Sequence, residues 1–171
     1  MQHTLIFKSR WGWMGLAESS AGIASIVLSK SSKQAVKASL GAKDQPAGTP
    51  SPRLLSARKQ LTQYLEGKRT SFTVPLDLSK GTTFQRRVWS VLRHVPYGRL
   101  SSYRSLAALV GGTQYARAVG NAVGSNPVPI IVPCHRVVAH DGSLGGFSCG
   151  LPIKRKLLAL EGSLSQVKRH R

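Results

Sequence analysis

With 171 residues, 41% of them hydrophobic, the chain is long enough for one ordinary domain or two small ones with a sizeable core. Its two cysteines are too few for a disulfide framework, no apolar run approaches the roughly 20 residues of a membrane span, and we expect no signal peptide. Lys and Arg outnumber Asp and Glu by 25 to 6, a formal charge of +19 that favours a polyanionic partner such as nucleic acid, with a soluble protein that has a solvated basic surface as the alternative.

Short apolar runs separated by Gly and Ser occupy the first forty residues, and they predict two or three strands of a small sheet. The runs are residues 5–7, 12–17 and 22–28. Residues 41–52 are rich in Gly, Pro, Ala and Thr, which favours a loop or linker. From Arg53 the apolar spacing becomes helical, and Gly67 is expected to end that helix. Residues 72–78 then cross to the second half of the chain, where Pro75 argues against a central strand.

Residues 82–124 are predicted to form three helices with sharp breaks between them. The expected N-caps are Thr82 or Thr83, Ser101 or Ser102, and Thr113. Two short helices joined by a turn that contains Gly are typical of a helix-turn-helix. The third helix, residues 114–123, consists mostly of small residues, which let a helix approach another surface closely, such as a DNA groove. Tight packing against another helix is the alternative explanation for these small residues.

The last third of the chain predicts a strand, a loop and a helix. The apolar run 130–137 is expected to form a strand that carries Cys134, and the Gly-rich residues 141–146 a flexible loop. Pro152 then opens a final helix, and residues 163–171 are expected to be a disordered basic tail. In this helix the expected apolar residues are Ile153, Leu157, Leu158 and Leu160, and the expected solvated residues are Lys154, Arg155 and Lys156.

A cysteine beside a histidine is the strongest chemical signal of the sequence. The thiolate is the nucleophilic form of cysteine, and the imidazole of His135 can take the proton of Cys134 while the charge of Arg136 favours the anion. The alternative is that Cys134 is a small buried apolar residue. Glu161, at the end of the apolar face of the last helix, can orient the histidine as the third member of such a set, or it can be a partly exposed glutamate.

A nucleophile on a strongly basic protein points to a nucleobase substrate, because a protease or acyl hydrolase has no use for such a charge. Chemistry on a base requires the base to leave the stack. Arg117, on the helix of small residues, is a candidate to fill the gap, with a phosphate contact as the alternative. Residues 145–148 are a candidate pocket wall, with an ordinary surface turn as the alternative.

A series of short motifs then carries a resemblance to a known family. The motifs are Pro75-Leu76-Asp77-Leu78, Gly81-Thr82-Thr83-Phe84-Gln85, Val88-Trp89, Pro96-Tyr97-Gly98, Ser102-Tyr103, Arg117-Ala118-Val119-Gly120, Asn126-Pro127 and Pro133-Cys134-His135-Arg136-Val137. In this order they resemble the O6-methylguanine-DNA methyltransferases, over roughly residues 53–162. The resemblance implies an α+β fold with a small N-terminal sheet domain that is ribonuclease H-like, residues 1–78. A mostly helical, winged-helix-like domain with the helix-turn-helix, residues 79–162, and the basic tail would follow.

The resemblance also implies a reaction. Cys134 would accept the alkyl group of O6-alkylguanine in double-stranded DNA by in-line displacement, once per molecule, with O4-alkylthymine as a second candidate substrate. His135 would take the thiol proton through a bound water, and Glu161 would hold the imidazole. Tyr103 would donate to the departing guanine. Asn126 would brace the turn between the recognition helix and the active site.

DNA-binding and pocket residues follow from the same resemblance. Arg117 would enter the duplex, and Ser148 would contact the base oxygen. The other expected DNA-binding residues are Ala116, Tyr103, Gly120 and Arg136. The expected pocket residues are Val137, Val138, Phe147, Ser148 and Pro129. No metal or other cofactor is implied, since the N-terminal domain has no cysteine to bind the zinc of some relatives, and we expect a cytoplasmic monomer, nuclear if the source is a eukaryote.

Two residues depart from the family pattern. Phe147 stands where many relatives have tyrosine, and Cys149 where relatives have glycine or a large aromatic residue, so the preferred alkyl size stays open. Three rival functions remain. A lesion-binding protein would lack the reactive cysteine, a helix-turn-helix regulator would ignore alkylation, and a cysteine hydrolase would turn over on small esters.

Overall fold

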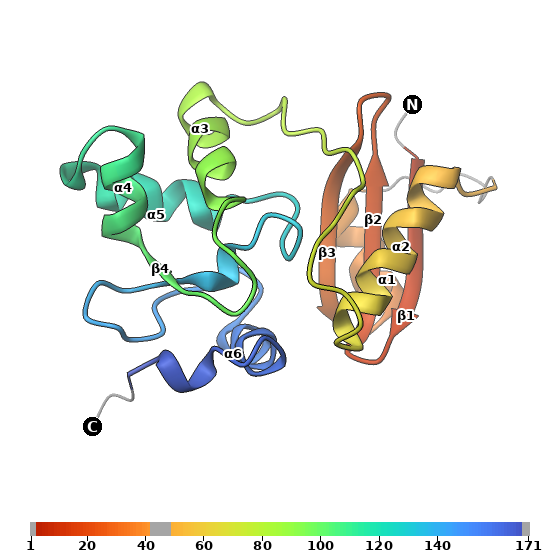
Figure 1. Cartoon of the computed structure of the whole chain (residues 1–171). Helices are drawn as coiled ribbons and strands as arrows, with labels where there is room; N and C mark the ends of the chain where they lie inside the picture. Colours follow the sequence, from red (N-terminus) through yellow and green to blue (C-terminus); the bar gives the residue numbers. More distant parts are fainter. Residues whose placement is uncertain (1–2, 42–48, 169–171) are drawn as a thin grey trace. The chain divides into compact units, whose positions relative to one another are not determined.

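Figure 1 shows the computed structural model of the chain, which describes residues 3–41 and 49–168. The chain divides after Leu78 into two compact units, residues 1–78 and 79–171. The predicted order of a small sheet domain and then a mostly helical domain is confirmed. Most of the predicted linker, residues 42–48, and the last three residues of the predicted tail lie outside the described residues. Within those residues no helix is long and apolar enough to cross a membrane.

The first unit contains one antiparallel sheet, whose strands are β1 (His3–Ser9), β2 (Gly12–Glu18) and β3 (Ile23–Lys30) in the order β1-β2-β3. The central strand β2 is buried on both faces, because α2 lies in front of the sheet and α1 behind it in Figure 1. At Gly15 the approach of α1 is so close that an added Cβ atom would lie 2.4 Å from Val36 Cγ1. Only glycine therefore fits at this position.

Two helices cover this sheet. The sequence-based prediction missed α1 (Lys33–Leu40), although its end signals are present: Ser32 accepts from the backbone N–H of Ala35, and Gly41 ends the helix in the left-handed region with φ 61°. The helix α2 (Pro52–Leu65) begins directly after its N-cap Ser51 and ends just before Gly67, as predicted. Its buried residues are Leu54, Ala57, Gln60, Leu61, Tyr64 and Leu65.

The crossing segment 72–78 is held along the start of β3. Ile23 N–H donates to the carbonyl of Pro75 at 2.9 Å, and Asp77 N–H donates to the carbonyl of Ile23 at 2.9 Å, so that Leu76 pairs with Ile23 in a parallel bridge. Proline has no N–H to donate, and the segment pairs through the residues around Pro75, consistent with an edge position.

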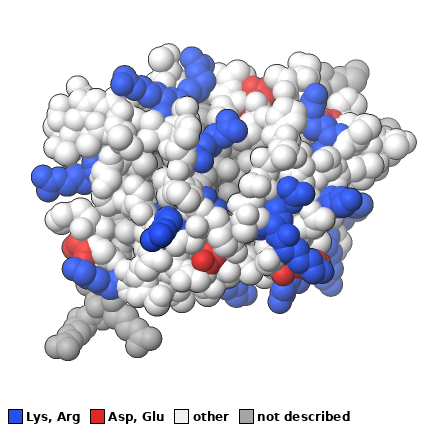
Figure 2. Space-filling model, in the orientation of Figure 1, with Lys and Arg blue, Asp and Glu red and all other residues white. Residues whose placement is uncertain are grey.

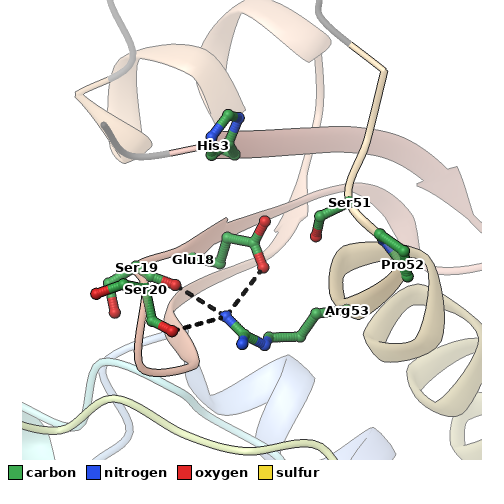
Figure 3. Close-up of a pocket in the computed structure, with 7 residues that line it drawn as sticks. All are labelled: His3, Glu18, Ser19, Ser20, Ser51, Pro52 and Arg53. Atoms are coloured by element: carbon green, nitrogen blue, oxygen red, sulfur yellow. Dashed lines mark hydrogen bonds and ion pairs between the residues drawn. The ribbon is translucent and has the colours of Figure 1, made fainter.

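A polar depression of about 530 Å³ lies in the first unit where β2 ends. Figure 3 shows Arg53 among its lining residues, where Nη1 donates to the carbonyls of Ser19 (2.9 Å) and Ser20 (3.3 Å) and lies 3.5 Å from the carboxylate of Glu18. The arginine therefore ties the β2–β3 turn to the first turn of α2. His3, Ser51 and Pro52 are the other residues that line this depression.

The second unit is built on three helices. The helix α3 (Thr83–Leu92) begins with a capping box, in which the side chains of Thr82 and Gln85 accept each other's backbone N–H. Ser102 caps α4 (Tyr103–Val110), and α5 (Ala116–Gly124) follows. Trp89 Nε1 donates to the carbonyl of Ala122 at 2.7 Å and so joins α3 to α5. The predicted cap at Thr113 is wrong, because Gly111 and Gly112 (φ 156° and 142°) lead into a 3-10 turn, Thr113–Tyr115, before α5 begins.

The remainder of the second unit surrounds the Cys-His motif. The two-residue strands β4 (Ser101–Ser102) and β5 (Val137–Val138) pair in parallel, and α6 (Leu151–Leu160) packs beside them with Pro152 in its first turn. The predicted disordered tail is partly wrong, since residues 163–168 are placed: Leu164–Gln166 form a 3-10 turn, and Lys168 N–H donates to the carbonyl of Gly142 at 2.9 Å.

Candidate active site

Cys134 lies in a 3-10 turn, Cys134–Arg136, and not in the predicted strand. The turn begins after the strained residue Ile130, whose φ of 76° is rare for a β-branched residue, and it closes when Arg136 N–H donates to the carbonyl of Pro133 at 3.0 Å. A 3-10 turn has about three residues per turn, so three consecutive side chains leave it in three directions. The side chains of Cys134, His135 and Arg136 can therefore all be buried, each against a different part of the second unit.

Asn126 holds the turn and touches the sulfur. Its Nδ2 donates to the carbonyl of Val132 at 2.8 Å and to Cys134 Sγ at 3.1 Å, and its Oδ1 accepts from Val128 N–H at 3.0 Å. The first and third of these bonds fix the chain between α5 and the turn, at the place where the resemblance implies a bracing role for Asn126. The bond to Sγ adds a donor that stabilises a thiolate more than a thiol.

Burial raises the pKa of the Cys134 thiol to about 12, although the Asn126 hydrogen bond and the charge of Lys154 both act to lower it. Only 2% of Cys134 is exposed, so the sulfur rests as a neutral thiol at neutral pH. The expectation that Arg136 supplies the positive charge is wrong, because Arg136 is paired with Glu161. Among the described residues, the cation whose charge acts to lower the pKa of Cys134 is Lys154.

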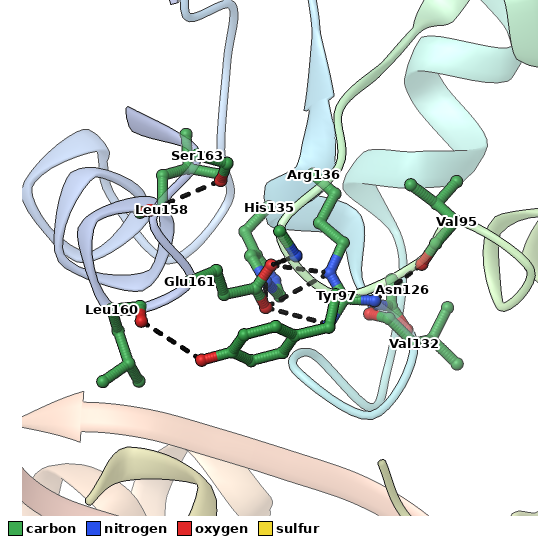
Figure 4. Close-up of polar contacts among 11 residues, drawn as sticks. Val95, Tyr97, Asn126, Val132, His135, Arg136, Leu158, Leu160, Glu161 and Ser163 are labelled. Carbon is green, nitrogen blue, oxygen red and sulfur yellow. Dashed lines mark hydrogen bonds and ion pairs between the residues drawn. The ribbon is translucent and has the colours of Figure 1, made fainter. Parts of the chain in front are cut away.

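The carboxylate of Glu161 accepts several hydrogen bonds, one of them from the histidine, as Figure 4 shows. Its carboxylate accepts from His135 Nε2 at 2.9 Å, from Arg136 Nη2 at 2.8 Å and Nε at 2.9 Å, and from Gly98 N–H at 3.0 Å. The guanidinium of Arg136 also donates to the carbonyl of Val95 at 2.6 Å and lies 5.7 Å from the centre of the Tyr97 ring. Arg136 is thus a buried partner of Glu161, and its position does not support the predicted contact with DNA.

His135 has the protonation state that a base needs. Burial lowers its pKa below the ordinary 6.5, against the opposing effect of the Glu161 carboxylate, so the ring is neutral at neutral pH. Because the carboxylate is an acceptor, Nε2 carries the hydrogen and Nδ1 is the basic nitrogen. The pairing of His135 with Glu161 expected from the sequence is present in the structure.

Tyr103 begins α4 and reaches the loop that follows β5. Its hydroxyl donates to the carbonyl of Gly146 at 3.4 Å, and its ring lies next to Gly120 of α5, 3.8 Å from where a Cβ atom would be. Burial raises the pKa of Tyr103, with the nearby Cys134 as a second cause, so the phenol stays protonated and can donate. Tyr103 therefore lies between the helix of small residues and the predicted pocket wall.

Lys154 is the functional candidate that the sequence analysis missed. It was expected in solvent, yet it is fully buried, and its Nζ donates to backbone carbonyls of Val137, Leu144 and Gly146. Burial lowers its pKa to about 8. The signal was present in the spacing, because Lys154 precedes Leu157 and Leu158 by three and four residues and so shares their apolar face. The two neighbouring cations, Arg155 and Lys156, are exposed as predicted.

The surface of the second unit has the charge that DNA requires. No Asp or Glu occurs between Leu78 and His140, and Figure 2 shows Lys and Arg spread over the visible face with few acids. Arg117 is exposed on α5, while Ala116 and Gly120 are half-buried on the same helix. This arrangement leaves a helix with little side-chain bulk and a protruding cation on an otherwise basic surface.

The expected pocket residues come from three segments. Val137 and Val138 are buried in β5, Pro129 is buried beside the Asn126 turn, and Phe147 is half-buried in the loop after β5. Ser148 is exposed in the same loop, where the Gly150 N–H donates to the carbonyl of Phe147 at 3.0 Å. The structure thus joins Cys134 to Asn126 and His135 to Glu161, and it leaves Ser148 and Arg117 at the surface.

Two family models match the chain in succession. Residues 3–78 match the ribonuclease-like domain of 6-O-methylguanine DNA methyltransferase, and residues 83–163 match the DNA binding domain of the same enzyme. The inducible methylated-DNA–protein-cysteine methyltransferase of Bacillus subtilis is 50% identical over 102 residues, which are 60% of this chain and 56% of that protein. The methylated-DNA–protein-cysteine methyltransferase of Mycobacterium tuberculosis is 50% identical over 116 residues, 67% of this chain and 70% of that protein.

Solved structures of two proteins superpose on nearly the whole chain. The O6-methylguanine methyltransferase of Mycobacterium tuberculosis superposes with a TM-score of 0.77 and 37% identity over 99% of this chain and 97% of that one. The OGT protein of the same organism in complex with DNA superposes with a TM-score of 0.77 and 38% identity, over 95% of this chain and 94% of that one.

Proposed function

Because the chain belongs to the 6-O-methylguanine DNA methyltransferase family, we propose that it repairs DNA by transferring the alkyl group of O6-alkylguanine to Cys134. The observation that carries this proposal is the arrangement around the sulfur. A buried thiol accepts a hydrogen bond from Asn126, and the adjacent residue is a neutral histidine held by a buried carboxylate. Nucleophilic catalysis by a cysteine requires these three parts: a nucleophile, a base that takes its proton, and a group that orients the base.

The first chemical step removes the thiol proton. Cys134 rests as a thiol, so it must lose the proton before or during attack. His135 Nδ1 accepts it, through one bound water, and the imidazolium that forms is stabilised by Glu161 on the opposite nitrogen. Arg136 and Gly98 fix the carboxylate in place. The bond from Asn126 strengthens as negative charge develops on the sulfur.

The second step transfers the alkyl group. Sγ of Cys134 attacks the alkyl carbon in line with its bond to the base oxygen, the carbon–sulfur bond forms, and the carbon–oxygen bond breaks with its electron pair returning to guanine. The phenol of Tyr103 hydrogen-bonds to the departing base and passes it a proton, the phenolate takes a proton back from solvent, and the His135 imidazolium releases the thiol proton to solvent, so that the protons balance. The product is an unmodified guanine and a thioether on the protein. Because the thioether does not revert, each molecule acts once.

Base extrusion must precede this chemistry, because an alkyl group inside the duplex cannot reach a buried sulfur. We propose that Arg117 fills the gap that the extruded base leaves in the stack. It is exposed on α5 among half-buried small residues. Exposed cations of the second unit contact phosphates and supply affinity that does not depend on sequence. We place the protein in the cytoplasm at the DNA, acting as a monomer.

Intact-protein mass spectrometry tests the proposal. After incubation with a duplex that contains one O6-methylguanine, the protein gains one methyl group, and peptide mapping places it on Cys134. The Cys134→Ala variant gains nothing but still binds the duplex, whereas Cys149→Ala, the matched control, still gains the methyl group. Methylation of Cys134→Ala, or an unmodified wild-type protein, overturns the assignment. A cysteine hydrolase would instead release product repeatedly from small esters, and a lesion-binding protein would leave the duplex methylated.

A further inference from the structure

Two lysines and a tryptophan form a row across the sheet of the first unit, near the β1–β2 turn. In the antiparallel register Lys8 of β1 lies opposite Trp13 of β2, and Trp13 lies opposite Lys30 of β3. Residues that lie opposite each other in an antiparallel pair share one face of the sheet, with their Cβ atoms about 4.5–5.5 Å apart. Lys8, Trp13 and Lys30, which we call the lysine–tryptophan row, therefore place a cation on each side of one indole ring.

The row lies on the face of the sheet that α1 covers. Trp13 and Gly15 are two positions apart on β2 and so point to the same side, and Val36 of α1 packs on Gly15. Lys8 and Lys30 are both exposed, and Trp13 is half-buried. Another exposed cation, the first residue of α1, follows Lys30 closely in the chain. This part of the face is therefore both accessible and basic.

Acidic residues are nearly absent from this part of the first unit. Within the described residues 3–41, Glu18 is the one acid, and it lies at the other end of β2, where Arg53 of α2 pairs with it. Glu66, which follows α2, pairs with Lys68 at 2.8 Å. Positive charges that face no counter-charge repel one another in the compact state, and a bound polyanion removes that repulsion. The row thus has the charge of a surface that binds an anionic chain.

The indole of Trp13 offers more than packing. Among the described residues its Nε1–H has no hydrogen-bond acceptor, and this atom is not buried. Trp89 shows the contrasting case, because its ring is 2% exposed and its Nε1 donates to the carbonyl of Ala122. A tryptophan that serves only the core usually pairs its N–H in this way. Trp13 instead keeps a donor and part of its ring for a ligand.

We propose that the lysine–tryptophan row binds single-stranded DNA, with phosphates on Lys8 and Lys30 and an unpaired base stacked on Trp13. Cations that follow the backbone and an aromatic ring on which a base stacks are the two parts of a single-strand site. A duplex fits less well, because its base faces are covered by their neighbours in the stack. The site goes beyond the proposed function, which uses the second unit and a duplex.

Tryptophan fluorescence of the whole chain measures the stacking. Because Trp89 is buried, Trp13 is the one half-buried tryptophan that remains in a Trp11→Phe variant. We expect a short oligothymidylate to quench its fluorescence with saturation, and a fully paired duplex of the same length to quench it much less. Inorganic polyphosphate, which carries charge but no bases, should displace the oligothymidylate without quenching. Equal quenching by the duplex or by polyphosphate contradicts a stacked base.

The salt dependence of oligothymidylate binding, followed by the same quenching, measures the phosphate contacts. Each phosphate contact to a single strand contributes about 0.7 to the slope of log K against log salt, so Lys8→Gln/Lys30→Gln should lower the slope by about 1.4 and weaken binding. Arg58→Gln/Lys59→Gln is the matched control. It removes two exposed charges from α2, on the other face of the sheet, and should leave both slope and affinity unchanged.

Near-ultraviolet circular dichroism and thermal unfolding establish that each variant is folded. Where Trp11→Phe does not fold, the salt slope of Lys8→Gln/Lys30→Gln with all tryptophans present carries the test. An unquenched Trp13, or the same slope in this double variant and the wild type, shows an ordinary solvated surface and overturns the inference. The proposed function is tested separately, by the mass of the wild-type protein after reaction with a methylated duplex, so the failure of one is distinguishable from the failure of the other.

Discussion

The side-chain amide of Asn126 donates a hydrogen bond to Cys134 Sγ, with 3.1 Å between nitrogen and sulfur. The same Nδ2 also donates to the carbonyl of Val132 at 2.8 Å. One residue therefore sets both the shape of the turn and the polarity around the sulfur. Asn126 directly follows the α5 region, so the helix expected to lie on DNA is connected to the reactive centre by a stretch of rigid, hydrogen-bonded backbone.

Replacing Asn126 with aspartate keeps the shape of the side chain but removes the donor and places a negative charge beside the sulfur. A hydrogen bond to a charged group contributes about 1.5–3 kcal/mol, so we expect the single-turnover rate constant at pH 7 to fall about 10- to 100-fold. Rapid-quench kinetics with a methylated duplex measures it. A rate constant equal to that of the wild type in a folded variant would show that the amide does not act on the sulfur.

Glu161→Gln tests the buried ion pair. Glutamine keeps the size of the side chain but leaves the Arg136 guanidinium buried without its counter-charge, which costs about 3–5 kcal/mol of unfolding free energy. Urea denaturation measures this loss, and methyl transfer slows in the same variant because the imidazole of His135 loses its support. Glu66→Gln is the control: it breaks the exposed pair with Lys68 and changes stability by less than about 1 kcal/mol.

The decrease of the transfer rate constant at low pH should reflect protonation of His135. Its pKa lies below 6.5 in the folded protein, so the transfer rate constant falls in acid with a midpoint below 6.5. The unfolded chain binds this proton first, so the unfolding free energy also decreases as the pH falls from 6.5 through the folded-state pKa. The His140→Gln variant, which alters an exposed histidine, keeps this decrease. A midpoint above 6.5 contradicts the assignment of His135 as the base.

Arg117→Ala separates base extrusion from chemistry. We expect its rate constant on a methylated duplex to fall at least about ten-fold, while reaction with free O6-benzylguanine stays close to that of the wild type. Stopped-flow kinetics on both substrates measures the difference. Losses of equal size on the two substrates would remove the gap-filling role and leave a general structural effect.

Gly15→Ala tests the packing of the first unit. The added methyl group would lie 2.4 Å from Val36 Cγ1 and 2.7 Å from Leu40 Cδ1, so α1 must move away from the sheet. Overpacking of this kind costs about 1–3 kcal/mol, which calorimetry detects as a lower melting temperature. Gly124→Ala, where nothing lies within 4 Å, leaves the melting temperature unchanged or slightly higher.

Periodic segments and end signals were predictable from the sequence. The three strands of the sheet, the helix α2 and the Thr82 and Ser102 caps all follow from local spacing. The helix α1 was missed because it buries only Val36 and so has almost no apolar stripe. Its cap residue Ser32 and terminal Gly41 were the remaining signals.

The sequence predicts the parts of the candidate site that are formed by adjacent residues. It does not predict the parts that depend on contacts between distant segments. Cys134 and His135 stand side by side in the chain, but the segment that leads to their 3-10 turn contains Ile130 in a left-handed conformation, which is rare for a β-branched residue. From the sequence alone, the charge of Arg136 is expected to act on the sulfur and Lys154 is expected to lie in solvent. The acceptors of Lys154 lie 8 to 17 residues earlier, so only the folded backbone shows why a lysine belongs on an apolar face.

Burial of the sulfur has a chemical benefit under the proposed reaction, which would consume the protein. Because burial raises the pKa of Cys134 to about 12, very little of the protein carries a thiolate at pH 7. Peroxides and stray electrophiles attack that anion, so the resting nucleophile is shielded from waste until a damaged base arrives. Burial of Cys134 therefore limits its reaction with oxidants in solvent, whereas Cys149 is only half-buried.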